Sequence, residues 1–175
     1  MSNGRIGSGN RHSTFNNSSI AAIWCVLEAV VDAEILVINV VEMGMIAGVD
    51  VKGDCVAIDV TPAFVGCPAL DVIRENIRTA VSAVTPAHVT VNVVVDPSWT
   101  SDRISANGRE SLKAFGLAPP GQCCSGGSVQ TLERTPCPYC NSLDTDLESV
   151  FGPPLCRSIH YRRSCLQAFE HFKAV

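Results

Sequence analysis

Cys67 lies where a predicted strand ends and a predicted helix begins, a position that changes the chemistry of a thiol. Pro68 suits the first position of a helix, because the N–H that it lacks has no partner within a helix. Cys67 would then be the N-cap, facing unpaired backbone donors and the positive end of the helix dipole. This environment favours the thiolate, which is the better nucleophile and metal ligand. On the local pattern alone, a small buried cysteine is the alternative interpretation.

A second group of thiols follows near the C-terminus. Cys137-Pro-Tyr-Cys140 has the spacing of a zinc knuckle, and a structural zinc ion takes four ligands. Cys165 stands where a second pair is expected, but Arg162 occupies the position three residues before it. Candidates for the fourth ligand are Cys156, the first choice because it is a thiol, His160 and His171. The alternatives are a unit that packs without metal and, less favoured, a redox pair.

Acidic and aromatic residues could complete a site around Cys67. Asp32 and Glu34 lie two residues apart on a segment predicted to be extended, so their side chains share one side and could help to bind iron. Two solvated acids in a turn after a helix are the alternative. Trp99, Thr100 and Asp102 follow a predicted strand. Trp99 could line the cysteine site or a partner groove, or close the core, while Thr100 and Asp102 could bond within their own loop.

The elements that must position these residues follow from hydrophobic periodicity. Alternation predicts strands, and apolar residues three and four apart predict helices. Helices are expected from Ser18 or Ser19 to about Val31, from Cys67 to about Val84, and from a Ser105 cap to Gly116, with strands over 46–51, 55–60 and 88–95. Their order predicts an α+β fold with helices on one face of a three-stranded sheet.

Composition divides the chain further. Residues 1–17 have the polar composition of a disordered tail, 18–116 form the α+β domain, and the Pro/Gly/Ser-rich segment 117–129 predicts a linker. Residues 130–175 then form a unit that is too small to fold without an additional cross-link such as a bound zinc ion.

Charge and cysteine usage exclude several function classes. The net charge of -4 argues against nucleic-acid binding. Nine cysteines, an odd number, with no secretory signal indicate reduced thiols and metal binding. The apolar run 20–31 is too short to span a bilayer. We therefore expect a cytoplasmic protein with no membrane partner.

Several motifs coincide in an order that points to a family. They are Asp32-Ala-Glu-Ile-Leu-Val, Glu42-Met-Gly-Met-Ile46, Thr61-Pro-Ala-Phe-Val-Gly-Cys-Pro68, Pro97-Ser-Trp-Thr-Ser-Asp102, Leu117-Ala-Pro-Pro120 and Cys137-Pro-Tyr-Cys140. Together they resemble the PaaD family, the small accessory subunits encoded with bacterial phenylacetyl-CoA epoxidase. Residues from about 20 to 116 resemble SufT-like iron–sulfur assembly factors, and the later part resembles the PaaD zinc-ribbon tail.

The resemblance implies a small iron–sulfur-assembly-type domain followed by a degenerate zinc ribbon, in which Arg162 replaces a ligand cysteine. It implies a non-catalytic maturation factor for metallocentres in phenylacetate degradation. Cys67 would bind or transfer iron or an iron–sulfur cluster transiently, Asp32 and Glu34 would assist, and zinc would be bound in the tail. The expected client is the oxygenase or the reductase of the epoxidase, and a homodimer is compatible with this role. A zinc-ribbon interaction module or a non-catalytic oxygenase subunit is the alternative.

Overall fold

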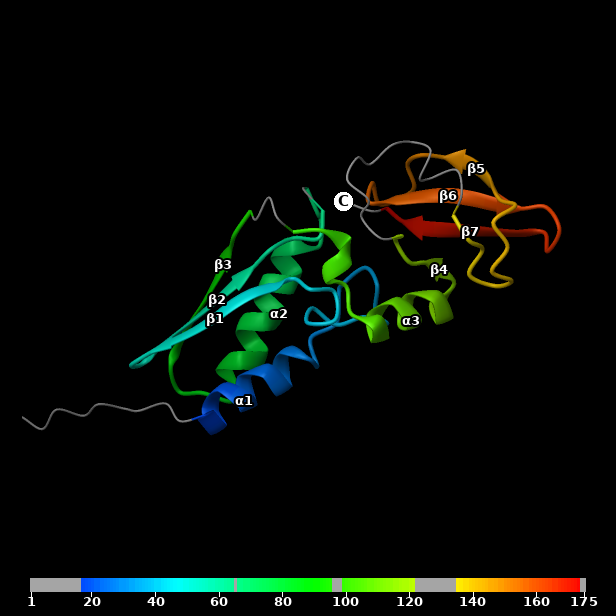
Figure 1. The fold of residues 1–175 in the computed structure, drawn as a ribbon. Coiled ribbons are helices and arrows are strands. Elements are labelled where there is room, and N and C mark those ends of the chain that lie inside the picture. The colour runs from blue at the N-terminus through cyan, green and yellow to red at the C-terminus, as the bar shows by residue number, and fades with distance from the viewer. Residues whose placement is uncertain (1–16, 65, 96–98, 122–134, 174–175) are drawn as a thin grey trace, which may run out of the picture.

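The computed structural model describes residues 17–64, 66–95, 99–121 and 135–173, and it contains two sheets. The N-terminal unit holds a three-stranded sheet with helices α1 to α3, and the C-terminal unit holds a four-stranded sheet. Figure 1 shows the two sheets at opposite ends of the molecule, with α3 (Ala106–Phe115) between them. No helix in the described ranges is long and apolar enough to cross a bilayer.

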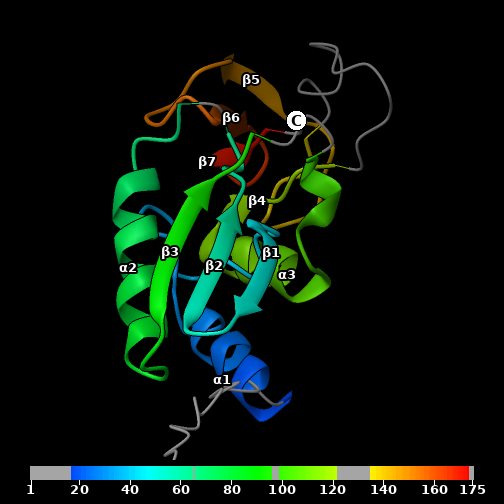
Figure 2. The same cartoon turned by 90° about the vertical axis from the view of Figure 1, so that its left-hand side faces the viewer.

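The N-terminal sheet has the strand order β1-β2-β3. Strands β1 (Ile46–Lys52) and β2 (Cys55–Val60) form an antiparallel hairpin, and β2 pairs in parallel with β3 (His88–Val93) after a crossover through α2 (Leu70–Ser82). Alternate β2 side chains share one buried cluster with side chains of α2 and of α1 (Asn17–Leu27). In Figure 2, α2 stands beside β3 and α1 lies at the lower end of the sheet. The α+β architecture expected from the sequence is therefore confirmed.

Three local expectations near Asp32 and Cys67 are wrong: the end of the first helix, the extended segment that follows it, and Cys67 as the N-cap of the second helix. Helix α1 ends at Leu27, not at about Val31, and the chain then turns instead of extending. The Asp32 Oδ1 atom accepts hydrogen bonds from the backbone N–H groups of Glu34 and Ile35, both at 2.8 Å, which closes an Asx turn. Helix α2 begins at Leu70 with Ala69 as its N-cap, because residues 67–69 form a turn before the first regular helical bonds.

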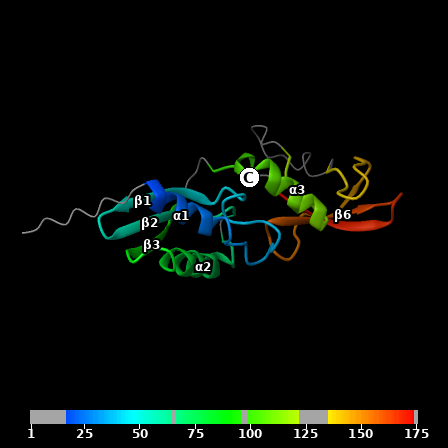
Figure 3. The same cartoon turned by 90° about the horizontal axis from the view of Figure 1, so that it is seen from below.

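Helix α3 begins and ends where the sequence predicts. The Ser105 hydroxyl oxygen accepts a hydrogen bond from the Gly108 N–H at 3.0 Å. Gly116 terminates the helix with φ of 91°, a conformation that favours glycine. A Cβ atom at Gly116 would also lie 2.6 Å from the Tyr139 hydroxyl of the C-terminal unit. Figure 3, viewed from below, shows α3 running towards that unit.

The C-terminal sheet has the strand order β4-β7-β6-β5. Its strands are β4 (Leu117–Ala118), β5 (Asp146–Ser149), β6 (Arg157–Arg162) and β7 (Gln167–Phe172). The first two residues of the predicted linker thus form a strand, which pairs in parallel with β7. The rest of the linker from 122 on and the predicted tail up to residue 16 lie outside the described residues, so the four-part division of the chain stays a prediction.

Two buried histidines lie inside the C-terminal sheet. The Ser158 hydroxyl is 2.9 Å from His160 Nε2 and 3.3 Å from His171 Nδ1. Burial lowers the pKa of His160 to about 4. Burial, followed by the charges of His160 and Lys173, lowers the pKa of His171 to about 3. Both rings are therefore neutral at pH 7.

These lowered pKa values predict a loss of stability in mild acid. Below pH 6.5 the unfolded chain binds protons that the folded rings reject, so the free energy of unfolding falls as the pH falls towards 4. We expect each ring to contribute about 3 kcal/mol to this loss. Urea titrations between pH 7 and 4 measure it. His160→Gln should flatten the dependence, whereas His88→Gln, at an exposed position, should not. An unchanged slope in His160→Gln would contradict the prediction.

Candidate functional site

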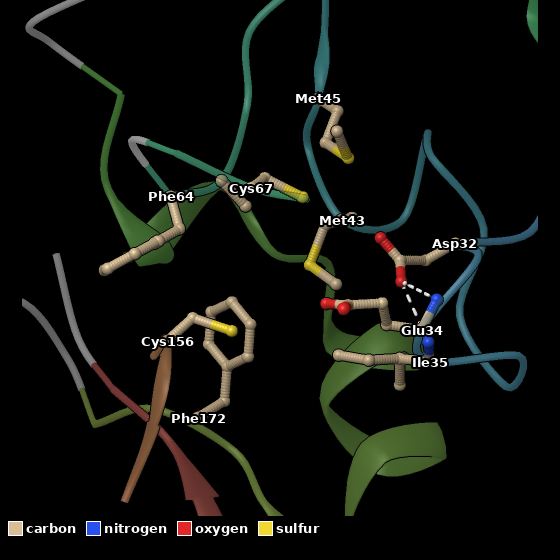
Figure 4. Close-up of a pocket in the computed structure, with 10 residues that line it drawn as sticks. Asp32, Glu34, Ile35, Met43, Met45, Phe64, Cys67, Cys156 and Phe172 are labelled. Atoms are coloured by element: carbon tan, nitrogen blue, oxygen red, sulfur yellow. Dashed lines mark hydrogen bonds between the residues drawn. The ribbon is translucent and has the colours of Figure 1, made fainter. Parts of the chain in front are cut away.

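Cys67 lines an open pocket at the junction of the two units (Figure 4). The pocket holds about 320 Å³, its mouth included. It combines two carboxylates with four sulfur atoms between aromatic walls, supplied by Asp32, Glu34, Met43, Met45, Cys67, Cys156, Phe64 and Phe172. The structure therefore brings together the three residues expected to hold iron or a cluster, Cys67, Asp32 and Glu34.

Backbone hydrogen bonds fix the acidic side of this pocket. Asp32 is only 7% exposed, and one of its oxygens holds the turn that carries Glu34. The backbone carbonyl of Glu34 in turn accepts a hydrogen bond from the Arg157 guanidinium of the C-terminal unit at 3.3 Å. The two carboxylates thus reach one pocket through a tight turn, not through the extended segment that the sequence predicted.

The electrostatics of Cys67 differ from the expectation of a stabilised thiolate. Burial is the largest cause and raises the pKa of the Cys67 thiol. Hydrogen bonds from the backbone N–H groups of Ala69 and Leu70 oppose this, while the charges of Asp32 and Glu34 raise the pKa further. The net result is a neutral thiol. A bound metal cation would reverse the balance, because it compensates the carboxylates and displaces the thiol proton.

Cys156, the first choice for the fourth ribbon ligand, lies in the same pocket as Cys67 instead. Burial is the largest cause of the raised pKa of its thiol; Arg157 lowers that pKa, and Glu34 and Cys67 raise it. The sequence suggested Cys156 only as a ribbon ligand. No spacing rule relates residue 156 to residue 67, so only the folded chain reveals this neighbour.

The ribbon thiols form a separate cluster. The sulfur atoms of Cys137, Cys140 and Cys165 lie within 4.8 Å of one another, and two of the distances are 3.9 Å. Tetrahedral zinc with bonds of about 2.3 Å needs sulfurs about 3.8 Å apart. These three residues therefore fit a zinc ion, which would join the Cys137–Cys140 turn to the β6–β7 hairpin. A hydrogen bond from Ser142, the largest cause, lowers the pKa of Cys140.

Arg162 occupies the sequence position three residues before Cys165, where a second Cys-x-x-Cys pair would have its first thiol, and it lies beside Cys140. Its guanidinium, 8% exposed, donates hydrogen bonds to the carboxylate of Asp144 and to the Cys140 sulfur. Within the described ranges the cluster has three ligands. The other three candidates lie elsewhere: His160 and His171 are buried beside Ser158. Cys156 lines the pocket that contains Cys67. Three thiols therefore lie beside one guanidinium group, which the Asp144 carboxylate holds in place.

Trp99, Thr100 and Asp102 do not line the Cys67 pocket. Trp99 is buried and donates its indole N–H to the Gly44 carbonyl at 2.9 Å, which matches its alternative role in closing the core. Thr100 occupies the N-cap position of the 3₁₀ turn Ser101–Arg103 without a capping hydrogen bond from its side chain, and Asp102 lies 3.8 Å from the Arg109 guanidinium. Any role of these residues in contacting a partner stays a prediction.

Removing either pocket acid should make Cys67 more acidic. Asp32→Asn keeps an oxygen that can accept the two turn hydrogen bonds but removes the charge, and Glu34→Gln removes the second charge. We expect the pH profile of Cys67 alkylation, followed by peptide mass spectrometry, to move to lower pH in both variants. Asp50→Asn, in the exposed β1–β2 hairpin, is the control. A profile that stays in place in both pocket variants would contradict the prediction.

Restoring the fourth thiol should tighten metal binding at the ribbon. Arg162→Cys adds a thiolate beside Cys140, and we expect zinc affinity to rise roughly tenfold or more. Competition with a zinc chelator measures this change. Arg162→Gln, which removes the cation without adding a ligand, should show no such gain. Equal affinities for the Cys and Gln variants would mean that the position does not face the metal.

Comparisons with known proteins agree with this division into two units. Residues 20–93 match the family described as iron-sulfur cluster assembly protein, and residues 122–173 match the PaaD zinc beta ribbon domain. A protein of Escherichia coli K12, provisionally named as one of the subunits of 1,2-phenylacetyl-CoA epoxidase, is 32% identical over 94% of this chain and 99% of its own length.

Two further similarities cover the N-terminal part. The Fe-S protein maturation auxiliary factor SufT of Staphylococcus aureus is 33% identical over 47% of this chain and 96% of its own length. The crystal structure of a domain of unknown function from Bacillus anthracis is 26% identical, with a TM-score of 0.45, and covers 54% of this chain and 92% of that chain. Because the Escherichia coli relative matches along nearly its whole length, this chain belongs to the PaaD family, with an iron–sulfur cluster assembly domain followed by a zinc ribbon.

Proposed function

We propose that this protein is a maturation factor that binds iron or an iron–sulfur cluster transiently at Cys67 and delivers it to a client metalloprotein. The observation that carries the proposal is the shared pocket lined by Cys67, Asp32 and Glu34, in which the charges of both carboxylates act on the Cys67 thiol. The names of the relatives, a maturation auxiliary factor and an epoxidase component, support the same role.

The pocket chemistry suits a donor that must release what it binds. Burial and two acids hold the empty Cys67 thiol in its protonated form, so protons compete with the metal for the sulfur. The pocket is partly open to solvent, since the Glu34 side chain is exposed and Cys67 is half-buried, which leaves a path for transfer to a partner. Weak retention and direct access are both properties of a carrier.

The same features argue against catalysis by Cys67. A nucleophilic cysteine needs a lowered pKa or an adjacent base, whereas the pKa of Cys67 is raised. The pocket side chains in the described part of the chain include no histidine. In the proposal the protein is therefore an accessory factor and not the oxygenase catalyst.

The proposed client is the oxygenase or the reductase component of a phenylacetyl-CoA epoxidase, whose metallocentres need assembly. The similarity to the Escherichia coli epoxidase component supports this choice. The ribbon would dock the client, and the reducing cytoplasm would keep the pocket thiols free. A homodimer stays a prediction.

Anaerobic reconstitution with iron and sulfide tests the proposal. We expect the wild-type protein to retain iron after desalting, and Cys67→Ser to retain roughly tenfold less, because a direct ligand is lost. Cys25→Ser, at an exposed position in α1, is the matched control and should load like the wild type. Equal iron content in the wild type and in Cys67→Ser would reject Cys67 as the ligand and the proposed function with it.

A further inference from the structure

One hairpin connects the ribbon cluster with the pocket around Cys67. Strands β6 and β7 pair antiparallel at six positions, along the full length of both strands. The turn that joins them carries Cys165, a member of the ribbon cluster. The open end of the hairpin supplies Cys156 and Phe172 to the pocket. In Figure 1 the turn points away from the N-terminal unit and the open end faces it. A strand of six residues is about 17 Å long, so the hairpin bridges two separate sites.

Contacts at the open end hold the pocket wall against the N-terminal unit. The Cys156 carbonyl accepts a hydrogen bond from the Lys173 N–H at 3.0 Å, which continues the pairing beyond the two strands. The buried Arg157 guanidinium, at the start of β6, donates to the Glu34 carbonyl at 3.3 Å. The Phe172 side chain is buried in the core cluster of the N-terminal unit. The shape of the pocket therefore depends on the hairpin keeping its place.

The turn end of the hairpin depends on the ribbon thiols for its packing. Among the described residues, the separate core cluster of the C-terminal unit consists of Ala118, Cys137 and Phe169, with Cys165 packed against it. Two of these four residues are themselves members of the ribbon cluster. A unit with so small a core needs an additional cross-link. Zinc bound by Cys137, Cys140 and Cys165 would supply it, and the binding free energy would stabilise the hairpin.

Ion pairs at the same end do not replace this cross-link. Arg162 pairs with Asp144, and Arg163 pairs with Asp146. These pairs hold the arginine side chains without a metal. The two carboxylates are nevertheless 88% and 43% exposed, and ion pairs in contact with solvent contribute little to stability. The metal is therefore the main stabilising contact that the turn end can gain or lose.

We propose that the metal site of the ribbon controls the pocket around Cys67 through the β6–β7 hairpin. With the ribbon thiols bound to zinc, the hairpin stays paired and holds Cys156, Phe172 and the loop of Glu34 in place. With these thiols free, the open end leaves the N-terminal unit more often, and the pocket loses one wall. The inference adds a control to the site of the proposed function and rests on that function for its role, whereas the coupling itself is measured without iron.

Pulse alkylation of the full-length protein tests the coupling. The zinc-loaded protein and the same protein stripped by a chelator are labelled anaerobically, digested and analysed by mass spectrometry, with fragment spectra that locate each label. We expect zinc removal to raise the labelling rates of Cys67 and Cys156 roughly fivefold or more, because both thiols are half-buried while the hairpin is in place. Returning zinc should restore the slow rates. Cys165→Ser should give the fast rates even with zinc present, whereas the matched control Cys25→Ser, at an exposed position in α1, should not.

Amide hydrogen exchange separates this coupling from general unfolding. In the zinc-free protein we expect faster exchange in β6, in β7 and in the loop 32–38, and unchanged exchange in β2, whose alternate side chains lie in the N-terminal core. Loss of protection in β2 as well would mean that the whole fold opens, which would overturn coupling through the hairpin. Unchanged labelling of Cys67 and Cys156 after complete zinc removal, or a protein that takes up no zinc, would overturn it too. None of these results measures iron retention, so the proposed function stands or falls separately in the reconstitution experiment.

Discussion

The packing of the C-terminal unit onto the core of the N-terminal unit is the constraint on which the site depends. Phe172 and Leu117, from the C-terminal sheet, are buried in the same cluster as the helices and strands of the first unit. The only separate cluster of the C-terminal unit among the described residues is Ala118, Cys137 and Phe169, with Cys165 against it. Burying a side chain such as Phe172 contributes about 2 kcal/mol, so this small unit gains stability from its neighbour while it completes the neighbour's pocket.

In the pocket, the Asp32 side chain both fixes the conformation of the backbone and contributes a negative charge. One Asp32 oxygen closes the turn that positions Glu34, while the carboxylate charge acts on Cys67. The backbone donors at Ala69 and Leu70 also face Cys67, but burial outweighs them. The result is a thiol that is neutral when the pocket is empty, and whose proton a metal cation can displace. In the proposed function, this competition between proton and metal would set the balance between binding and release.

The ribbon cluster follows a different charge balance. Three thiolates around a divalent zinc ion carry one net negative charge, and the buried Arg162 guanidinium beside Cys140 compensates it. Arg162 is itself held by Asp144, so its position does not depend on a metal. Among the described residues, the cluster therefore combines three thiols with a fixed positive charge at the position where the sequence analysis expected a fourth cysteine.

Local patterns in the sequence determined the elements, and the tertiary structure decided the site. Alternation at Val56, Ile58 and Val60, the Ser105 cap with Gly116, and the Cys137/Cys140 spacing each act within a few residues, so each could be predicted. Other features depend on hydrogen bonds that hydrophobic periodicity does not reveal. They are the Asx turn at Asp32, the start of α2 at Leu70 and the strand at Leu117. Cys156 lines the same pocket as Cys67 only because the two units pack together. Contacts between residues so far apart in the chain leave no period in the sequence, and for that reason only the folded protein reveals them.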